Sequence, residues 1–191
     1  HAALALVGRN AALSTTGYHA LFRERLGLDI ETASNAQLRE ALGDVVINPD
    51  GLTRDDWLDL LMTHRLQPGF ADDQLLAVID YPASQCALAR LRDGDPPVAE
   101  RFELYLGSLE LANGYHELAD AAEQGARFDR DGATRSARGA VVPPRDENLI
   151  TALGSGFPDC AGVALGVDRL LMAMLGTSRI GDVLAFDFTR A

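Results

Sequence analysis

The feature that most constrains this chain is a short apolar segment, residues 110–117, that carries four chemically active side chains: Glu110, Asn113, His116 and Glu117. A glutamate in an apolar strand costs free energy unless another group compensates its charge. The segment therefore predicts a binding site or, as the alternative, a strand with one face in water.

The spacing of the two glutamates adds a geometric condition. Glu110 and Glu117 are seven residues apart, an odd number that puts them on opposite faces of an unbroken strand. Asn113 and Gly114 both tolerate left-handed backbone, so a bend there would bring the glutamates together. We therefore expect a strand, a bend at Asn113–Gly114, and a helix that begins near Glu117.

The rest of the chain predicts a mixture of helices and strands. Helices are expected at residues 18–26 after a cap within 14–16, at 35–42 after Ser34, and from 54 after Thr53. Strands are expected at 75–81, 101–106 and 109–112, the last two joined as an antiparallel hairpin. Further on come a helix capped by Asp146, a strand over 160–166 and a buried helix, apolar nearly all round, over 167–175.

A second segment that could take part in binding or catalysis contains Gly162, Gly166 and Arg169. Its glycines allow close approach of the backbone, and an arginine in an apolar helix needs an anionic partner. A phosphate would satisfy Arg169 through charge-assisted hydrogen bonds, and a carboxylate such as Glu110 is the alternative. Glutamates and an arginine together would suit ATP with Mg²⁺ and a substrate that carries an amino group.

Composition narrows the possible partners. The chain has 28 acidic and 17 basic side chains, a net charge of −11, which argues against a protein whose main work is to grip nucleic acid. No apolar run approaches the ~18–20 residues that span a bilayer, so no membrane partner is expected. Cys86 and Cys160 lack partner spacing and are expected to be free thiols in a reducing, cytoplasmic setting.

Several motifs together resemble a known family. Residues 101–106 and 109–120, with Gln124 and residues 127–128, resemble the second half of class II lysyl-tRNA synthetase catalytic domains, and residues 162–172 resemble motif 3 of that class. Residues 81–85, His116, residues 158–160 and Ala164 resemble a short paralogue family, the elongation factor P–lysine ligases.

The resemblance implies an α+β fold: a class II aminoacyl-tRNA synthetase-like antiparallel β-sheet flanked by helices, incomplete at its N-terminal side. Residues 1–70 would be a mostly helical segment inserted between motif 2, which is absent, and the sheet. Residues 71–191 would be the C-terminal part of the catalytic domain. The resemblance also implies that the full-length protein is a homodimer.

The implied reaction is that of a ligase. Lysine or β-lysine is activated by ATP through an aminoacyl-adenylate and passed to a lysine of elongation factor P. Two alternatives remain open: the catalytic part of a lysyl-tRNA synthetase, with tRNA as acceptor, and a non-catalytic binding module derived from such a domain.

The resemblance also assigns roles to residues that contact the nucleotide. Glu110 and Arg169 would be the catalytic residues. Glu110 and Leu111 would contact ATP, Glu110 through Mg²⁺. Gly166 would lie against the adenylate, and Arg169 would bind the γ-phosphate or the adenine end of ATP.

A second set of residues would bind the amino acid. Asn113 would orient it, and Glu117 would face its ammonium group and stand as the second candidate metal ligand. Ala164 would line the pocket, and His116 belongs to the same substrate-binding set.

Motifs 1 and 2 have no counterpart in this sequence, and class II catalysis needs the motif 2 arginine at the α-phosphate. We therefore expect that the 191-residue chain alone forms no adenylate. In a pyrophosphate-exchange assay with lysine or β-lysine it should show no exchange above background. Measurable exchange by this exact chain would contradict that expectation.

Overall fold

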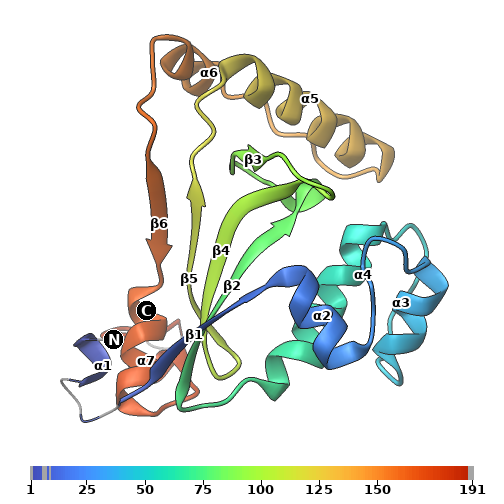
Figure 1. The fold of residues 1–191 in the computed structure, drawn as a ribbon. Coiled ribbons are helices and arrows are strands. Elements are labelled where there is room, and N and C mark those ends of the chain that lie inside the picture. The colour runs from blue at the N-terminus through green and yellow to red at the C-terminus, as the bar shows by residue number, and fades with distance from the viewer. Residues whose placement is uncertain (1, 6–7, 9, 189–191) are drawn as a thin grey trace.

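A computed structural model describes residues 2–5, 8 and 10–188 of the chain. Its centre is a six-stranded sheet in the order β1-β2-β4-β5-β6, with the short β3 paired to β4 (Figure 1). The strands are β1 (Ala12–Gly17), β2 (Gln74–Pro82), β3 (Leu91–Arg92), β4 (Val98–Leu106), β5 (Leu109–His116) and β6 (Ala161–Leu165).

Helices gather in three places around the sheet. In Figure 1, α2, α3 and α4 lie beside β1 and β2, α5 and α6 lie beyond one end of the sheet, and α1 and α7 lie at the other end. Their bounds are α1 (Ala2–Ala5), α2 (Tyr18–Leu26), α3 (Asn35–Leu42), α4 (Arg54–Leu61), α5 (Ala121–Ala137), α6 (Glu147–Gly154) and α7 (Val167–Leu175). A π-helical turn, Met62–Leu66, extends α4, and 3₁₀ turns lie at Gln67–Gly69, Ala83–Gln85 and Ile180–Asp182.

Most predicted helix starts are confirmed. Ser34 and Thr53 each form a capping box with the residue three positions on, and the Asp146 side chain accepts from Leu149 N–H. These side chains satisfy backbone donors that a helix start leaves without partners. The cap predicted within residues 14–16 is wrong, because those residues lie in β1 and Gly17 precedes α2.

The expected antiparallel sheet contains one parallel pair of strands. β1 runs parallel to β2, with Ala12 opposite Gln74 and Gly17 opposite Ile79, whereas the other strand pairs are antiparallel. A parallel pair needs a long crossover connection, and the helical segment between Gly17 and Gln74 supplies it. The first 70 residues thus contribute a strand to the sheet as well as the helices expected there.

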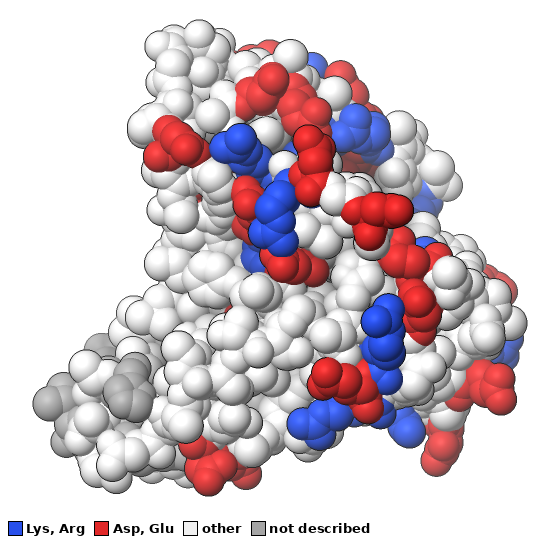
Figure 2. Space-filling view, in the orientation of Figure 1, with Lys and Arg blue, Asp and Glu red and all other residues white. Residues whose placement is uncertain are grey.

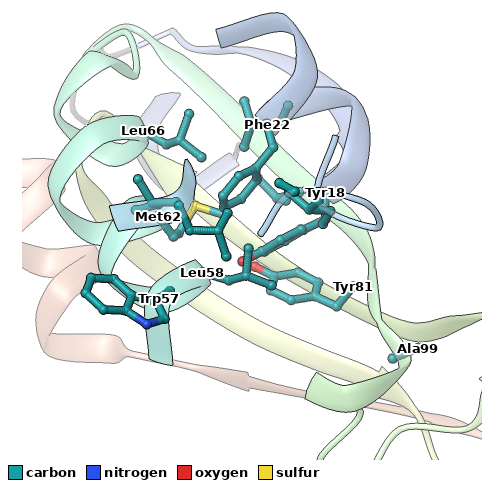
Figure 3. Packing of buried hydrophobic residues seen from close by; sticks show 14 of the residues in the cluster. Tyr18, Phe22, Trp57, Leu58, Met62, Leu66, Tyr81 and Ala99 are labelled. Atoms are coloured by element: carbon teal, nitrogen blue, oxygen red, sulfur yellow. The ribbon is translucent and has the colours of Figure 1, made fainter. Parts of the chain in front are cut away.

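The larger core lies between the helical segment and one face of the sheet, called the front face below. The strand residues of this core are Val78, Tyr81, Ala99 and Tyr105, all nearly or fully buried. Figure 3 shows how aromatic and aliphatic side chains from α2, α4 and the π-helical turn interlock with them; it labels Tyr18, Phe22, Trp57, Leu58, Met62, Leu66, Tyr81 and Ala99. Tyr18 stacks on Phe22 and lies against Tyr81, each with ring centroids 4.7 Å apart.

A smaller core covers the opposite face, called the back face. Leu75, Leu106 and Leu111 pack there against Ala173 of α7 and Leu4 of α1. The expectation that α7, apolar nearly all round, is a buried helix is wrong. Among its residues Met172 and Ala173 are buried, whereas Val167 and Leu175 are exposed, because α7 packs against the sheet with one side only.

Cys86 and Cys160 are free thiols. None of the helices in the described part of the chain is long and apolar enough to cross a membrane.

Gly114 in β5 offers a test of how tightly the back face is packed. A Cβ there would lie 2.5 Å from the Phe102 ring and 2.7 Å from the carbonyl oxygen of Gly162. Backbone of a neighbouring strand cannot yield easily, so Gly114→Ala should lower the free energy of unfolding by about 1–3 kcal/mol. Chemical denaturation measures this change.

Gly154→Ala is the matched control. Apart from its chain neighbours and the backbone of its own helix, no described atom lies within 4 Å of a Cβ built at Gly154. Alanine also favours helix over glycine, so this variant should match the parent protein or exceed its stability by up to about 1 kcal/mol. Equal effects of the two substitutions would contradict the packing described for Gly114.

Candidate active site

A β-bulge, rather than a bend, brings the two glutamates to the same face. Tyr105 pairs with Glu110 and Leu104 with Ala112, so Leu111 has no residue opposite it. The extra residue shifts the alternation of side chains by one position. As a result Glu110, Asn113, Tyr115 and Glu117 all project from the front face.

The expected bend at Asn113–Gly114 and the helix near Glu117 are therefore wrong. β5 stays paired with both neighbouring strands through those residues and ends at His116. Glu117 still bridges to Ala89, and the next helix, α5, begins at Ala121 after its cap Asp120. The bulge lies two to three residues earlier than the predicted bend and has the same effect on the glutamates.

The front face has a covered half and an open half. Over β2 and β4 the helical segment buries it, as the core around Tyr81 and Tyr105 shows. Over β5 and β6 the side chains are half-buried or exposed, including Ala164, which faces Asn113 across the sheet. Because these side chains are at least partly exposed, a ligand would have access at the β5–β6 half. On the face of the molecule drawn in Figure 2, few charged side chains lie around β6 and α7.

Glu110 and Arg169 meet at the end of β5 that carries the bulge. A guanidinium nitrogen (Nη1) of Arg169 lies 3.3 Å from Glu110 Oε2 and donates to the Glu110 carbonyl oxygen at 3.0 Å. The arginine side chain is 49% exposed and the glutamate 34%, so both remain open to a ligand. The structure thus contains the carboxylate partner that the sequence left as an alternative to phosphate.

The start of α7 completes this end of the site. Gly166 precedes α7 with no side-chain cap, and its own N–H donates to the Leu111 carbonyl oxygen at 2.9 Å. A Cβ at Gly166 would lie 3.5 Å from the Arg169 side chain, an ordinary van der Waals contact. The side chain of Leu111 itself is buried in the back-face core, which leaves its backbone as the part nearest to a ligand.

Asn113 lies in the middle of the front face with an unused acceptor. Its Oδ1 atom is buried and has no hydrogen-bond partner among the described residues. A buried polar atom without a partner costs free energy, which a bound ligand or water would recover. An unpaired acceptor of this kind is more typical of a binding site than of a protein core.

Glu103, directly opposite Asn113, is a site residue that sequence reasoning missed. It receives hydrogen bonds from Arg101 at 2.5 Å and from the Tyr105 hydroxyl, and its side chain is 12% exposed. Burial and the nearby carboxylate of Glu103 raise the pKa of Tyr105, which keeps that hydroxyl a donor. The alternation of Arg101, Glu103 and Tyr105 with apolar residues was the available signal.

Arg101, the partner of Glu103, contacts several residues around it. Its guanidinium carbon lies 4.4 Å from the centre of the Tyr81 ring and 6.0 Å from that of Tyr115, and it donates to the Gln85 carbonyl oxygen at 3.2 Å. A cation between two aromatic faces, paired with Glu103, is fixed from several sides. Arg101 therefore orients the floor of the site.

The metal ion expected for Glu110 and Glu117 stays a prediction. Glu110 lies near the start of β5 and Glu117 directly after its end, with both side chains on the front face. No group of three or more acidic, histidine or cysteine side chains placed for a metal occurs among the described residues. On the front face Glu103 lies opposite Asn113, and Glu110 lies opposite Tyr105.

Glu117 lies at the other end of β5, where β6 makes room for it. A Cβ on Gly162 would collide with the Glu117 carboxylate, and the Glu117 N–H donates to the Cys160 carbonyl oxygen at 2.9 Å. His116 is not brought into this group. Its side chain points to the back face, where it contacts Glu100 and Asp159.

The Arg101–Glu103 pair predicts a strong energetic coupling. Arg101→Met leaves a largely buried carboxylate without its cation and should cost about 3 kcal/mol of stability. The double variant Arg101→Met/Glu103→Gln should cost less than the sum of the single variants, by about 1–3 kcal/mol. Urea denaturation of the four proteins in the cycle measures this coupling.

Arg23→Met is the control for that cycle. Arg23 pairs with Asp29 at 3.4 Å, with side chains 66% and 47% exposed. Such an exposed pair should contribute less than about 1 kcal/mol. If the Arg101 and Arg23 variants lose equal stability, the role given to Arg101 is wrong.

Comparisons with known proteins place the chain in a family. A family model described as tRNA synthetases class II (D, K and N) matches residues 44–190. An elongation factor P–(R)-β-lysine ligase of Salmonella gallinarum is 45% identical over 177 residues, which is 91% of this chain and 54% of the relative. A protein of the same name from Enterobacter sp. is 45% identical over 184 residues, 95% of this chain and 57% of the relative.

The chain therefore spans about half the length of the curated relatives it matches. The family model covers most of the chain and includes both of the segments that carry the site. The chain belongs to the class II tRNA synthetase family of the aspartate, lysine and asparagine type.

Proposed function

We propose that this protein is a ligase that activates a lysine-type amino acid, preferably β-lysine, with ATP and transfers it to a lysine of elongation factor P. The observation that carries the proposal is the row of Glu110, Asn113 and Glu117 along the open half of the front face. The shared name of the relatives supports this choice of acceptor over tRNA.

In this proposal the bulged end of β5 binds the nucleotide. Arg169, partly exposed at the start of α7, would pair with a phosphate group of ATP. Glu110, with Asn113 and Glu103 beside it, would hold Mg²⁺ through oxygen atoms. Mg²⁺ would neutralise charge on the phosphates as pyrophosphate leaves, and Gly166 would let the adenylate lie close to the backbone.

The other end of β5 would bind the amino acid. Glu117 would pair with an ammonium group of the substrate, and Asn113 would orient the carboxylate that attacks the α-phosphate. Ala164 would line the floor between them, opposite Asn113. Since positioning and charge neutralisation supply most of this catalysis, the spacing along β5 would select a substrate of matching length.

The acceptor and assembly complete the proposal. The net charge of −11 suits a protein acceptor better than a tRNA. We also propose that the full-length protein acts as a homodimer in the cytoplasm, as the family resemblance implies.

A titration of Mg²⁺·ATP by calorimetry tests the nucleotide end of the site. The protein expressed from its complete gene should bind Mg²⁺·ATP, and Glu110→Gln or Arg169→Ala should each weaken binding about 10–100-fold, the loss of a charge-assisted contact. The loss for Glu110→Gln should shrink when Mg²⁺ is left out. Arg23→Ala, at an exposed pair outside the site, is the control.

Two outcomes would contradict the proposal. One is binding of Mg²⁺·ATP that neither substitution weakens. The other is nucleotide binding without any exchange of pyrophosphate in the presence of lysine or β-lysine, which would favour the non-catalytic module.

A further inference from the structure

His116 occupies an unusual position between two carboxylates. On the back face its Nδ1 atom lies 2.6 Å from Glu100 Oε2 of β4, and its Nε2 atom lies 2.5 Å from Asp159 Oδ1. Carboxylates accept hydrogen bonds, so both ring nitrogens must donate, which requires the imidazolium form. Hydrogen bonds to Asp159 and Glu100 accordingly raise the pKa of His116.

Two arginines in or next to β3 pair with the carboxylates around His116. Arg90 Nη1 lies 3.5 Å from Asp159 Oδ1. Arg92 Nη1 lies 3.6 Å from Glu100 Oε1, and Arg92 Nη2 lies 2.8 Å from Asp80 Oδ2. The backbone joins the same elements, because the Arg90 N–H donates to the His116 carbonyl oxygen at 2.8 Å. His116 therefore links β4, β5 and the connection from α6 to β6.

The connection that Asp159 belongs to leads directly into the substrate end of the site. Cys160, the next residue, accepts the hydrogen bond of the Glu117 N–H. Two residues further on, Gly162 leaves the space that the Glu117 carboxylate occupies. Within the described part of the chain β6 pairs with β5 alone, so few other contacts fix this connection.

We propose that His116 and Asp159 form a clasp across the back of the sheet that positions Glu117 on its front for the ammonium group of the substrate. The inference rests on the proposed function for the role of Glu117, whereas the clasp itself rests on contacts in the fold. His116 and Asp159 are positioning residues, since neither touches the open half of the front face. His116 and residues 158–160, which the sequence analysis named separately, thus position Glu117 together.

The test uses His116→Ser and Asp159→Asn in the protein expressed from its complete gene. Hydrogen exchange of the Glu117 amide reports on the clasp without any reaction. Each variant should speed this exchange about tenfold or more, because the Cys160 carbonyl is no longer held in place. The double variant should exchange no faster than the faster single variant, since either substitution opens the same clasp.

Steady-state kinetics reports on the positioning. Each variant should raise the KM for the amino acid about tenfold, while kcat and the KM for ATP change less than about threefold. A general loss of stability would instead lower the active fraction and leave both KM values unchanged. Asp159 has a highly exposed side chain, so Asp159→Asn keeps the test available if His116→Ser does not fold.

His19→Ser is the matched control. His19 also contacts a carboxylate, Glu31 at 2.5 Å, but it lies in α2. It should alter neither the Glu117 exchange rate nor either KM. Unchanged Glu117 exchange and unchanged KM for the amino acid in both clasp variants would overturn the inference. Faster exchange in a protein that activates no amino acid would keep the clasp and refute the proposed function instead.

Discussion

The register shift between β4 and β5 is the constraint on which the rest of the site depends. Because Leu111 has no residue opposite it, Glu110 joins Asn113 and Glu117 on the front face. Without the bulge, Glu110 would project from the face opposite Asn113 and Glu117, away from any ligand they bind. Leu111 itself fills the back-face core, so the same residue that breaks the register also anchors it.

The two faces of the sheet then take different tasks. The helical segment covers the front face over β2 and β4, where Arg101 is held between aromatic rings and fixes Glu103. The front face over β5 and β6 stays open for ligands. The back face carries the apolar contacts with α7 and, at its far end, the polar cluster around His116. Stability and binding are thus served by neighbouring parts of one sheet.

Sequence patterns predicted the features that depend on local physics. The caps at Ser34, Thr53 and Asp146 each need only one side chain that accepts a hydrogen bond from the backbone N–H three residues further on. The β4–β5 hairpin follows from alternation around a turn. The strand status of β1 was missed because serine and threonine suit both caps and strands, and its pairing with β2 bridges more than fifty residues.

The site was predictable in its membership more than in its geometry. Glu110, Asn113 and Glu117 stood out as polar residues in an apolar strand, but a bulge is set by two strands at once and cannot be placed from one. The side chain of His116 falls on the back face because it alternates with Tyr115 and Glu117, which project from the front face. Glu103 escaped notice because its alternation with Phe102 and Leu104 is ordinary for a half-exposed strand.

A crystal structure of the protein with a non-hydrolysable ATP analogue and β-lysine tests the central claim most directly. The account predicts a bulge at Leu111, the phosphates between Glu110 and Arg169, and the amino acid continuing along the same face past Asn113 to Glu117. A regular β5 without the bulge, or a ligand bound against the face that carries His116, would contradict it.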